Sequence, residues 1–182
     1  MTERIETDMN ENAYINNRTE MNRLRTEFCA KSCNEGLARA IVSAAAVQLD
    51  PTLGELSDIV TAVSEAVTNS IIHGYGNSVN PKDKCFVEME CVLYKDAMEV
   101  TVTDRGCGIE NIQKAREPMY TSSPEMERSG MGFTIMESFT DHFSVESEPG
   151  KGTVIKLFKI FRSVSEEDCG GDDLCESTTT QP

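Results

Sequence analysis

The feature that most constrains the fold is the apolar periodicity of residues 52–73. Leucine, valine and isoleucine recur there at spacings of three and four, which places one helix face on a core; these residues are Leu53, Leu56, Val60, Val63, Val67 and Ile71. The segment follows Asp50-Pro51-Thr52 and precedes His73-Gly74-Tyr75. Because proline disfavours helix at the residue before it and glycine ends helices, the sequence predicts one long helix between these signals.

A second stripe of this helix carries Glu65 and Asn69, which are four residues apart and therefore lie one above the other. Such a stripe ordinarily faces water. Residues 61–72, however, contain a single charged residue, Glu65, so the helix is apolar nearly all round and is expected to be buried nearly all round. A carboxylate in such a place needs a metal, a ligand or a transferable proton as its partner. The sequence therefore marks Glu65 as a candidate catalytic residue.

Length and composition are those of one globular domain rather than two. The chain has 182 residues and a net charge of −14, which disfavours direct binding of nucleic acid and leaves a basic protein partner open. Seven cysteines without Cys-x-x-Cys spacing, and no secretory signal, indicate reduced thiols in a cytoplasmic protein and argue against a zinc site. No run approaches the roughly 20 apolar residues of a membrane span.

The distribution of polar residues divides the chain into three parts. Residues 1–20 are polar and lack periodicity, which predicts a flexible N-terminal extension. Residues 163–182 hold six acidic residues and no Lys or Arg, which predicts a disordered acidic tail. The domain proper is expected over residues 21–162.

The order of the expected elements indicates an α+β fold. A helix over residues 35–49, with Asn34 as its expected N-cap, precedes the long helix. Alternating polarity predicts strands over residues 23–30, 84–94, 97–103, 143–147 and 153–161. Two helices followed by a hairpin favour a two-layer α/β sandwich, in which helices cover one face of a mixed, mainly antiparallel sheet, over a series of βαβ units.

Two glycine-rich segments follow. Asp104-Arg105-Gly106-Cys107-Gly108 continues a strand, and both a simple turn and a ligand-binding loop fit it. After a long polar segment, Ser129-Gly130-Met131-Gly132-Phe133 opens an amphipathic helix, where free N–H groups and the helix dipole favour a phosphate. The second segment lacks the Gly-Lys-Ser/Thr ending of a P-loop, which excludes that motif.

Three features thus occur in one order: Glu65-x-x-x-Asn69 on a helix, Asp104-x-Gly106-x-Gly108 after a strand, and Gly130-x-Gly132 opening a helix. Together they resemble the Bergerat-type ATP-binding fold of the gyrase, Hsp90, histidine kinase and MutL superfamily. Residues 63–69, 71–75 and 127–136 further resemble the family of bacterial anti-sigma F factors, and the resemblance covers about residues 21–162. Proteins of that family sequester a sporulation sigma factor and phosphorylate a serine of an anti-anti-sigma protein.

The resemblance implies a role for each matched residue. Glu65 would be the general base for the incoming serine hydroxyl, and Asn69 would ligate Mg²⁺ together with phosphate oxygens and water. Asp104 would accept a hydrogen bond from the adenine amino group, with Thr153 nearby. Arg128 would add positive charge near the γ-phosphate. Arg39 matches the arginine of the family's partner-binding surface. The remaining nucleotide contacts would come from Gly106, Gly108, Ser129, Gly130, Met131, Gly132 and Phe133.

The sequence departs from the family at two positions. Ser123 stands where relatives often carry a lysine, and Cys107 interrupts the glycine loop, where we expect a small buried thiol. His73 continues the Glu65 stripe, and we expect it to be a helix-end residue rather than a phosphoacceptor.

The resemblance leaves several functions open. The first is a homodimeric anti-sigma factor that inhibits a sigma F-like factor and, with ATP and Mg²⁺, phosphorylates an anti-anti-sigma protein on serine. The second is an ATP-dependent sigma-binding module without catalysis, and the third is a related stress-response anti-sigma serine kinase. A sensor histidine kinase fragment is disfavoured, because no phosphoacceptor helix pair and no membrane segment precede the domain.

Overall fold

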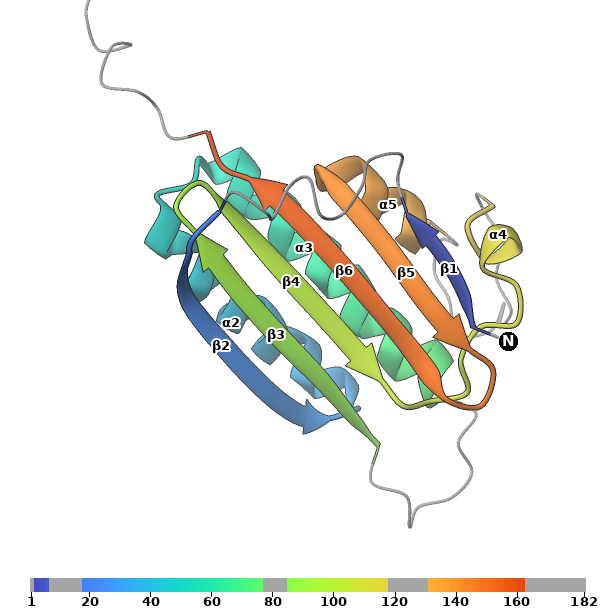
Figure 1. Cartoon of the computed structure of the whole chain (residues 1–182). Helices are drawn as coiled ribbons and strands as arrows, with labels where there is room; N and C mark the ends of the chain where they lie inside the picture. Colours follow the sequence, from blue (N-terminus) through green and yellow to red (C-terminus); the bar gives the residue numbers. More distant parts are fainter. Residues whose placement is uncertain (1, 7–17, 77–84, 118–130, 163–182) are drawn as a thin grey trace, which may run out of the picture.

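The computed structural model describes residues 2–6, 18–76, 85–117 and 131–162. It has two layers, a six-stranded sheet and a layer of helices against one of its faces (Figure 1). The strands are β1 (Glu3–Glu6), β2 (Glu20–Cys29), β3 (Phe86–Tyr94), β4 (Ala97–Asp104), β5 (His142–Glu148) and β6 (Gly152–Ile160). The helices are α2 (Glu35–Ala46), α3 (Leu53–Asn69), α4 (Ile112–Ala115) and α5 (Gly132–Phe139). The expected α+β sandwich is confirmed.

The strand order in the sheet is β1-β5-β6-β4-β3-β2, and every neighbouring pair of described strands is antiparallel. Helices α2 and α3 lie between β2 and β3 in the chain. Strand β3 therefore begins near the end of β2 and runs antiparallel to it. Strand β5 runs parallel to β4, but β6 lies between them. The parallel component of the expected mixed sheet is therefore absent among the described strands.

Helix α3 begins at a complete capping box. The Thr52 hydroxyl accepts the Glu55 N–H at 3.3 Å, and the Glu55 carboxylate accepts the Thr52 N–H at 2.9 Å. At its other end the helix continues into a π-helical turn over Ser70–Gly74. Asn34 precedes α2 as expected but makes no cap bond: a 3₁₀ turn already holds its backbone helical, and its amide donates to the Cys29 carbonyl at 2.7 Å.

The main core lies between the helices and the sheet. Alternate residues of β3, namely Val87, Met89 and Cys91, face the helices, as Val100 and Val102 of β4 do. The buried residues of α3 are Ile59, Ala62, Val63, Ala66 and Val67. Leu53, expected on this face, is the first residue of the helix and is 87% exposed. None of the helices in the described part of the chain combines the length and apolar character needed to cross a bilayer.

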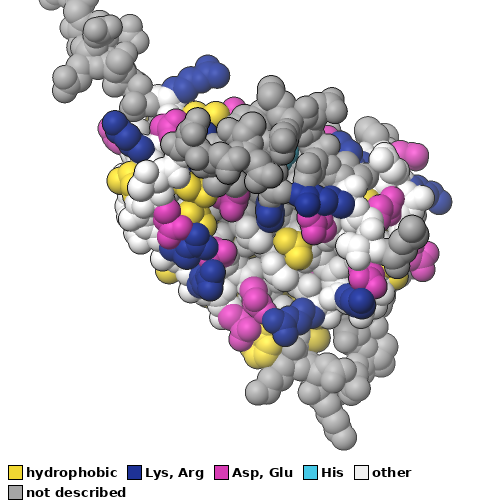
Figure 2. Space-filling model, in the orientation of Figure 1, with side chains coloured by type: hydrophobic (Ala, Val, Ile, Leu, Met, Phe, Trp, Pro, Cys, Tyr) yellow, Lys and Arg dark blue, Asp and Glu magenta, His cyan; other side chains and the backbone are white. Residues whose placement is uncertain are grey.

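The opposite face of the sheet, which none of the described helices covers, carries a small apolar cluster among charged residues. Val92, Tyr94, Ala97 and Phe158 form this cluster, and the Arg18 guanidinium lies 5.4 Å from the centre of the Phe158 ring. Figure 2 shows acidic and basic side chains interspersed over this face. The cross-strand ion pair between Arg25 and Glu90 is one example of this mixing.

Residues 3–6 differ from the flexible extension expected over residues 1–20. They form β1, which pairs antiparallel with β5 at the far edge of the sheet from β2 (Figure 1). The contacts that hold β1 are made with distant parts of the chain, so the polar composition of the segment alone did not indicate them. The expected acidic tail, residues 163–182, lies outside the described residues.

Candidate nucleotide-binding site

The C-terminal half of α3 carries the two residues with the strongest chemical signal. Glu65 and Asn69 are both half-buried, and no residue from 61 to 72 is exposed, as the composition of that stretch predicted. Helix α5 begins directly opposite them. A Cβ added to Gly132 would lie 3.2 Å from Glu65 Oε2 and 3.2 Å from Asn69 Nδ2. The absence of a side chain at Gly132 therefore lets the start of α5 approach the carboxylate and the amide closely.

Asp104 ends β4 beside the π-helical turn and is only 4% exposed. Its Oδ1 accepts the Gly106 N–H at 2.9 Å, and the carboxylate also accepts the Ser70 hydroxyl and the Thr153 N–H. Burial raises the pKa of Asp104, while these three hydrogen bonds act in the opposite direction. The carboxylate is therefore held in a fixed orientation in an environment that disfavours its charge.

Three glycines pack backbone around Asp104. A Cβ on Gly74 would lie 2.9 Å from Asp104 Oδ1, and a Cβ on Gly152 would lie 2.1 Å from the Asp104 carbonyl oxygen. A Cβ on Gly106 would lie 2.1 Å from the carbonyl oxygen of Gly74. Side chains at Gly74 or Gly106 would push the turn after α3 away from the end of β4, and one at Gly152 would push β6 away from it.

Gly108 makes a different close contact. Its φ of +69° is one that side-chain-bearing residues rarely adopt, and a Cβ there would lie 2.2 Å from the carbonyl oxygen of Glu148. The missing side chains of Gly106 and Gly108 thus face protein backbone, which gives both glycines a structural reason. Their predicted approach to a nucleotide remains a prediction.

Thr153 belongs to a small buried hydroxyl network next to Asp104. Its hydroxyl lies 3.0 Å from that of Ser147. The Ser147 hydroxyl also lies 2.9 Å from the Gly152 carbonyl oxygen and 2.9 Å from the Ile109 nitrogen, whose N–H it accepts. This network joins the loop after β4 to the β5–β6 hairpin.

Cys107 differs from the small buried thiol expected in the glycine loop, because the residue is exposed. Its backbone is fixed on both sides: its N–H donates to Gly74 at 2.9 Å, and its carbonyl accepts the Gly150 N–H at 2.7 Å. These bonds turn the side chain outward, where the thiol donates to the His73 carbonyl at 3.0 Å. His73 stands at the end of α3, as expected, in the π-helical turn.

Arg39 lies on α2, on the side that contacts α3. It is exposed, and its Nη1 donates to the Ser64 hydroxyl at 3.1 Å. Because Ser64 directly precedes Glu65, this contact places the arginine on the surface next to the candidate catalytic stripe.

Of the remaining predicted nucleotide contacts, Met131 and Phe133 belong to the described residues. Met131 is 43% exposed directly before α5. Phe133 is half-buried, and its ring packs against that of Phe143 with ring centres 6.0 Å apart. Arg128, Ser129, Gly130 and Ser123 lie outside the described residues.

Three residues of this site were missed in the sequence. Ser70 and Gly74 contact Asp104, and Ser147 contacts Thr153. From the residues themselves, Gly74 is predicted as part of a helix stop and a turn, without a role in the site. The sequence does contain a signal for this contact, namely one glycine just beyond the helix (Gly74) and another just beyond a strand (Gly106). Two backbones can touch closely where neither carries a side chain.

Asn69 is the side chain expected to hold Mg²⁺. In the described part of the chain, no three His, Cys, Asp or Glu side chains gather as a metal-binding cluster. Asn69 offers one amide oxygen, and Mg²⁺ in proteins commonly takes few protein ligands with substrate phosphates and water. Glu65, Asn69 and the start of α5 thus form one side of a candidate Mg²⁺–nucleotide site, and Asp104 and Thr153 form another.

Comparison with known proteins identifies the family of the chain. Residues 30–159 match the histidine kinase-like ATPase domain. The anti-sigma F factor of Clostridium perfringens strain SM101 is 56% identical over 138 residues, which cover 76% of this chain and 96% of that protein. The anti-sigma F factor of Clostridium beijerinckii is 50% identical over 144 residues, which cover 79% of this chain and 98% of that protein.

A solved structure shows the same fold at lower similarity. The RsbU and RsbW domains of Rv1364c from Mycobacterium tuberculosis superpose with a TM-score of 0.55 at 19% identity. The superposition covers 78% of this chain and about a third of that one (33%). Because the identity is low, this superposition supports the fold alone. The clostridial relatives, in contrast, are similar in sequence over nearly their whole length. The chain belongs to the anti-sigma F factor family, whose core is a histidine kinase-like ATPase domain.

Proposed function

We propose that this protein is an anti-sigma factor that binds a sigma F-like sporulation sigma factor and transfers the γ-phosphoryl group of ATP to a serine of an anti-anti-sigma protein. The observation that carries the proposal is the approach of Gly132 to Glu65 and Asn69. It brings a helix N-terminus, which favours phosphate, next to a carboxylate suited to proton removal. Membership of the anti-sigma F factor family supports the choice of partners.

In this proposal Glu65 accepts the proton of the serine hydroxyl as the serine oxygen attacks the γ-phosphorus. The bond between the γ-phosphorus and the β–γ bridging oxygen breaks, and ADP leaves. Asn69 would hold Mg²⁺ through its amide oxygen, and the ion would supply neutralisation of phosphate charge. Phosphoryl transfer needs mainly positioning and charge neutralisation, so one base beside oriented N–H groups is a sufficient protein contribution. Arg128 supplies further positive charge near the γ-phosphate.

Asp104 and its surroundings bind the base of the nucleotide. Its carboxylate is fixed by three hydrogen bonds and accepts a further one from the adenine amino group, with Thr153 beside it. The backbones of Gly106, Gly108, Ser129, Gly130, Met131, Gly132 and Phe133 supply the rest of the contact. Orientation in advance of binding reduces the entropy lost when the nucleotide binds.

Arg39 contributes to partner binding. It is exposed one helix away from Glu65 and is tied to Ser64, so a protein docked over α2 would lie next to the catalytic stripe. We further propose that the protein acts in the cytoplasm as a homodimer.

The decisive experiment incubates the full chain with γ-labelled ATP, Mg²⁺ and a candidate anti-anti-sigma protein. We expect label on a serine of that protein, and loss of transfer when the serine is replaced by alanine. Co-purification identifies the sigma factor and separates a sporulation role from a stress-response role. ATP-dependent sigma binding without any label transfer would instead establish a non-catalytic binding module.

A further inference from the structure

Strand β1 lies outside residues 30–159, the part of the chain that matches the ATPase domain. It nevertheless contacts the loop that follows Asp104. In the β1–β5 pairing, Glu3 lies opposite Ser147. Ser147 is the residue whose hydroxyl joins Ile109 to Gly152 and Thr153. The N-terminal strand therefore lies directly beside the hydroxyl network of the candidate site.

The Glu3 side chain makes the most specific contact. Its Oε2 accepts the backbone N–H of Ile112 at 2.9 Å, across 109 residues of sequence. Ile112 is fully buried and is the first residue of α4. Asn111 caps the same helix by accepting the Lys114 N–H at 2.8 Å. Both acceptors cap the N-terminal N–H groups of this four-residue helix: Asn111 is local in sequence, and Glu3 belongs to β1.

Helix α4 is in turn connected to α5. Arg116 pairs with Glu137 at 2.5 Å, and both side chains are largely buried, with 25% and 29% of their surface exposed. Helix α5 is the helix whose first residue, Gly132, lies against Glu65 and Asn69. A continuous set of contacts therefore runs from Glu3 through α4 to the catalytic stripe.

A second contact reaches the glycine loop. The Thr2 hydroxyl donates to Glu148 Oε2 at 2.9 Å. The carbonyl of Glu148 is the group against which Gly108 packs, and the nearby Gly150 N–H donates to Cys107. The N-terminal residues thus contact both segments that enclose the predicted base-binding end of the site.

We propose that β1 is an intramolecular brace of the nucleotide site and that Glu3 is a positioning residue for nucleotide binding, acting through α4. The inference rests on the nucleotide binding proposed above. Loss of the Glu3 contact is expected to uncap α4 and loosen the loop between Asp104 and Ile112. Bound nucleotide would then have to order this loop, which lowers its affinity.

The test compares Glu3→Ala and Glu3→Gln with Arg4→Ala in the full chain. Arg4→Ala is the matched control, because Arg4 is the next residue of the same strand and pairs with Glu146 of β5. Two quantities are measured: amide hydrogen exchange of residues 108–116, and the dissociation constant of a fluorescent ATP analogue. Thermal unfolding of each variant tests for general destabilisation.

For Glu3→Ala we expect Ile112 exchange to accelerate about fivefold, as for loss of a helix cap, and the dissociation constant to rise about threefold. Glu3→Gln keeps a carbonyl acceptor and should lie between Glu3→Ala and the wild type. Unchanged exchange at Ile112 in Glu3→Ala, or an equal change in Arg4→Ala, would overturn the brace. If the wild-type chain fails to bind the analogue, the proposed function fails, while the exchange data still decide whether β1 braces α4.

Discussion

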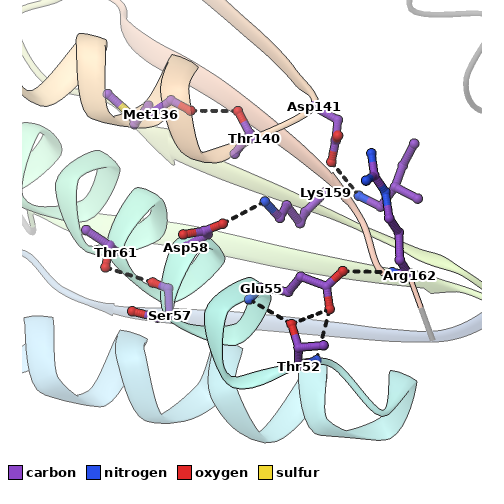
Figure 3. Close-up of polar contacts among 11 residues, drawn as sticks. Thr52, Glu55, Ser57, Asp58, Thr61, Met136, Thr140, Asp141, Lys159 and Arg162 are labelled. Atoms are coloured by element: carbon purple, nitrogen blue, oxygen red, sulfur yellow. Dashed lines mark hydrogen bonds and ion pairs between the residues drawn. The ribbon is translucent and has the colours of Figure 1, made fainter. Parts of the chain in front are cut away.

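The two ends of α3 use polar side chains in opposite ways. At the N-terminal end they are paired within the chain (Figure 3). Thr52 and Glu55 form the capping box, Glu55 also accepts the Arg162 N–H at 2.8 Å, and Asp58 pairs with Lys159 at 2.9 Å. The contacts with Lys159 of β6 and with Arg162 just beyond it tie the start of the helix to the end of the domain, and each satisfies a group that would otherwise need water.

At the C-terminal end the polar side chains lie against the backbone of glycines. Glu65 and Asn69 face the Cα of Gly132, and the nearly buried Asp104 lies against the Cα of Gly74. The pKa values of the carboxylates reflect the contrast. Burial raises the pKa of Asp104, whereas the bonds from Arg162 and Thr52 outweigh burial and lower the pKa of Glu55.

The comparison shows that one helix serves two purposes along its length. The N-terminal half contributes stability, because its charges are satisfied by the fold itself. The C-terminal half carries Glu65 and Asn69 and ends beside Asp104 of β4, a carboxylate whose charge the fold disfavours, as expected where residues meet a ligand. Substitutions of the α3 acids at the two ends should therefore separate stability from activity.

The largest contrast is expected between two acids of α3. Glu65→Gln should lower phosphoryl transfer by about 10²–10⁴-fold through loss of the general base, while ATP binding persists. Asp58→Asn, its matched control two turns earlier, should leave transfer unchanged. Single-turnover transfer with labelled ATP and equilibrium nucleotide binding measure the two effects. Transfer at the wild-type rate by Glu65→Gln would remove Glu65 from the mechanism.

Two glycines offer the next largest contrast. Gly106→Ala should destabilise the protein by about 1–3 kcal/mol, because its Cβ would lie 2.1 Å from the Gly74 carbonyl oxygen. Gly54→Ala, near the start of α3, should stabilise it by about 0.5–1 kcal/mol, since the nearest atom to its Cβ is 4.0 Å away. Denaturant unfolding measures both. Equal effects would mean that the backbone packing around Asp104 is not tight.

Glu55 and Asp104, the carboxylates at the two ends, should change the free energy of unfolding in opposite directions as pH rises. Folding lowers the pKa of Glu55. The ionised Glu55 carboxylate therefore adds to the free energy of unfolding above about pH 4.3, and this stabilisation is lost as pH falls through the lowered pKa. Because the pKa of Asp104 is raised, the stability it adds when protonated is present below about pH 3.9 and is lost as pH rises through the raised value.

Denaturant unfolding between pH 3 and 7 tests this contrast. The difference in unfolding free energy between Asp104→Asn and the wild type should shift in favour of the variant as pH rises. For Glu55→Gln the difference should shift against the variant. Parallel slopes for the two variants would contradict the contrast between the two carboxylates.

The smallest expected effect concerns the ion pair between Asp58 and Lys159. Lys159→Met should cost about 0.2–1 kcal/mol, because the pair is partly exposed and screened, with 36% of the Asp58 side chain accessible. Nucleotide affinity should stay the same. Thermal unfolding at low and high salt provides the measurement, and a change in affinity would show that the two ends are coupled.

The sequence predicted the parts of this protein that depend on local spacing. The period of three and four located α3, and the single acid in residues 61–72 marked Glu65 within a stretch that proved unexposed. The same spacing failed at Leu53, because periodicity identifies a helix face but not where that face leaves the core.

Contacts between distant segments were not predictable in the same way. Ser70 and Gly74 meet Asp104 only after the turn beyond α3 packs on the end of β4. The expected burial of Cys107 was wrong. Its exposure accompanies backbone hydrogen bonds to Gly74 and Gly150, which the local sequence does not indicate. Strand β1 was missed because four residues are too few to show a pattern, and because its partners lie more than 100 residues away.

The strand order has a consequence for assembly. Strands β1 and β2 are the two outermost strands of the sheet, and β1 has four residues where β2 has ten. An outermost strand is a template on which another chain can add a strand of its own, and a short one offers a poor template. A second subunit that extends this sheet would therefore find most of its hydrogen-bonding partners along β2, and the N-terminal residues would shield the opposite margin.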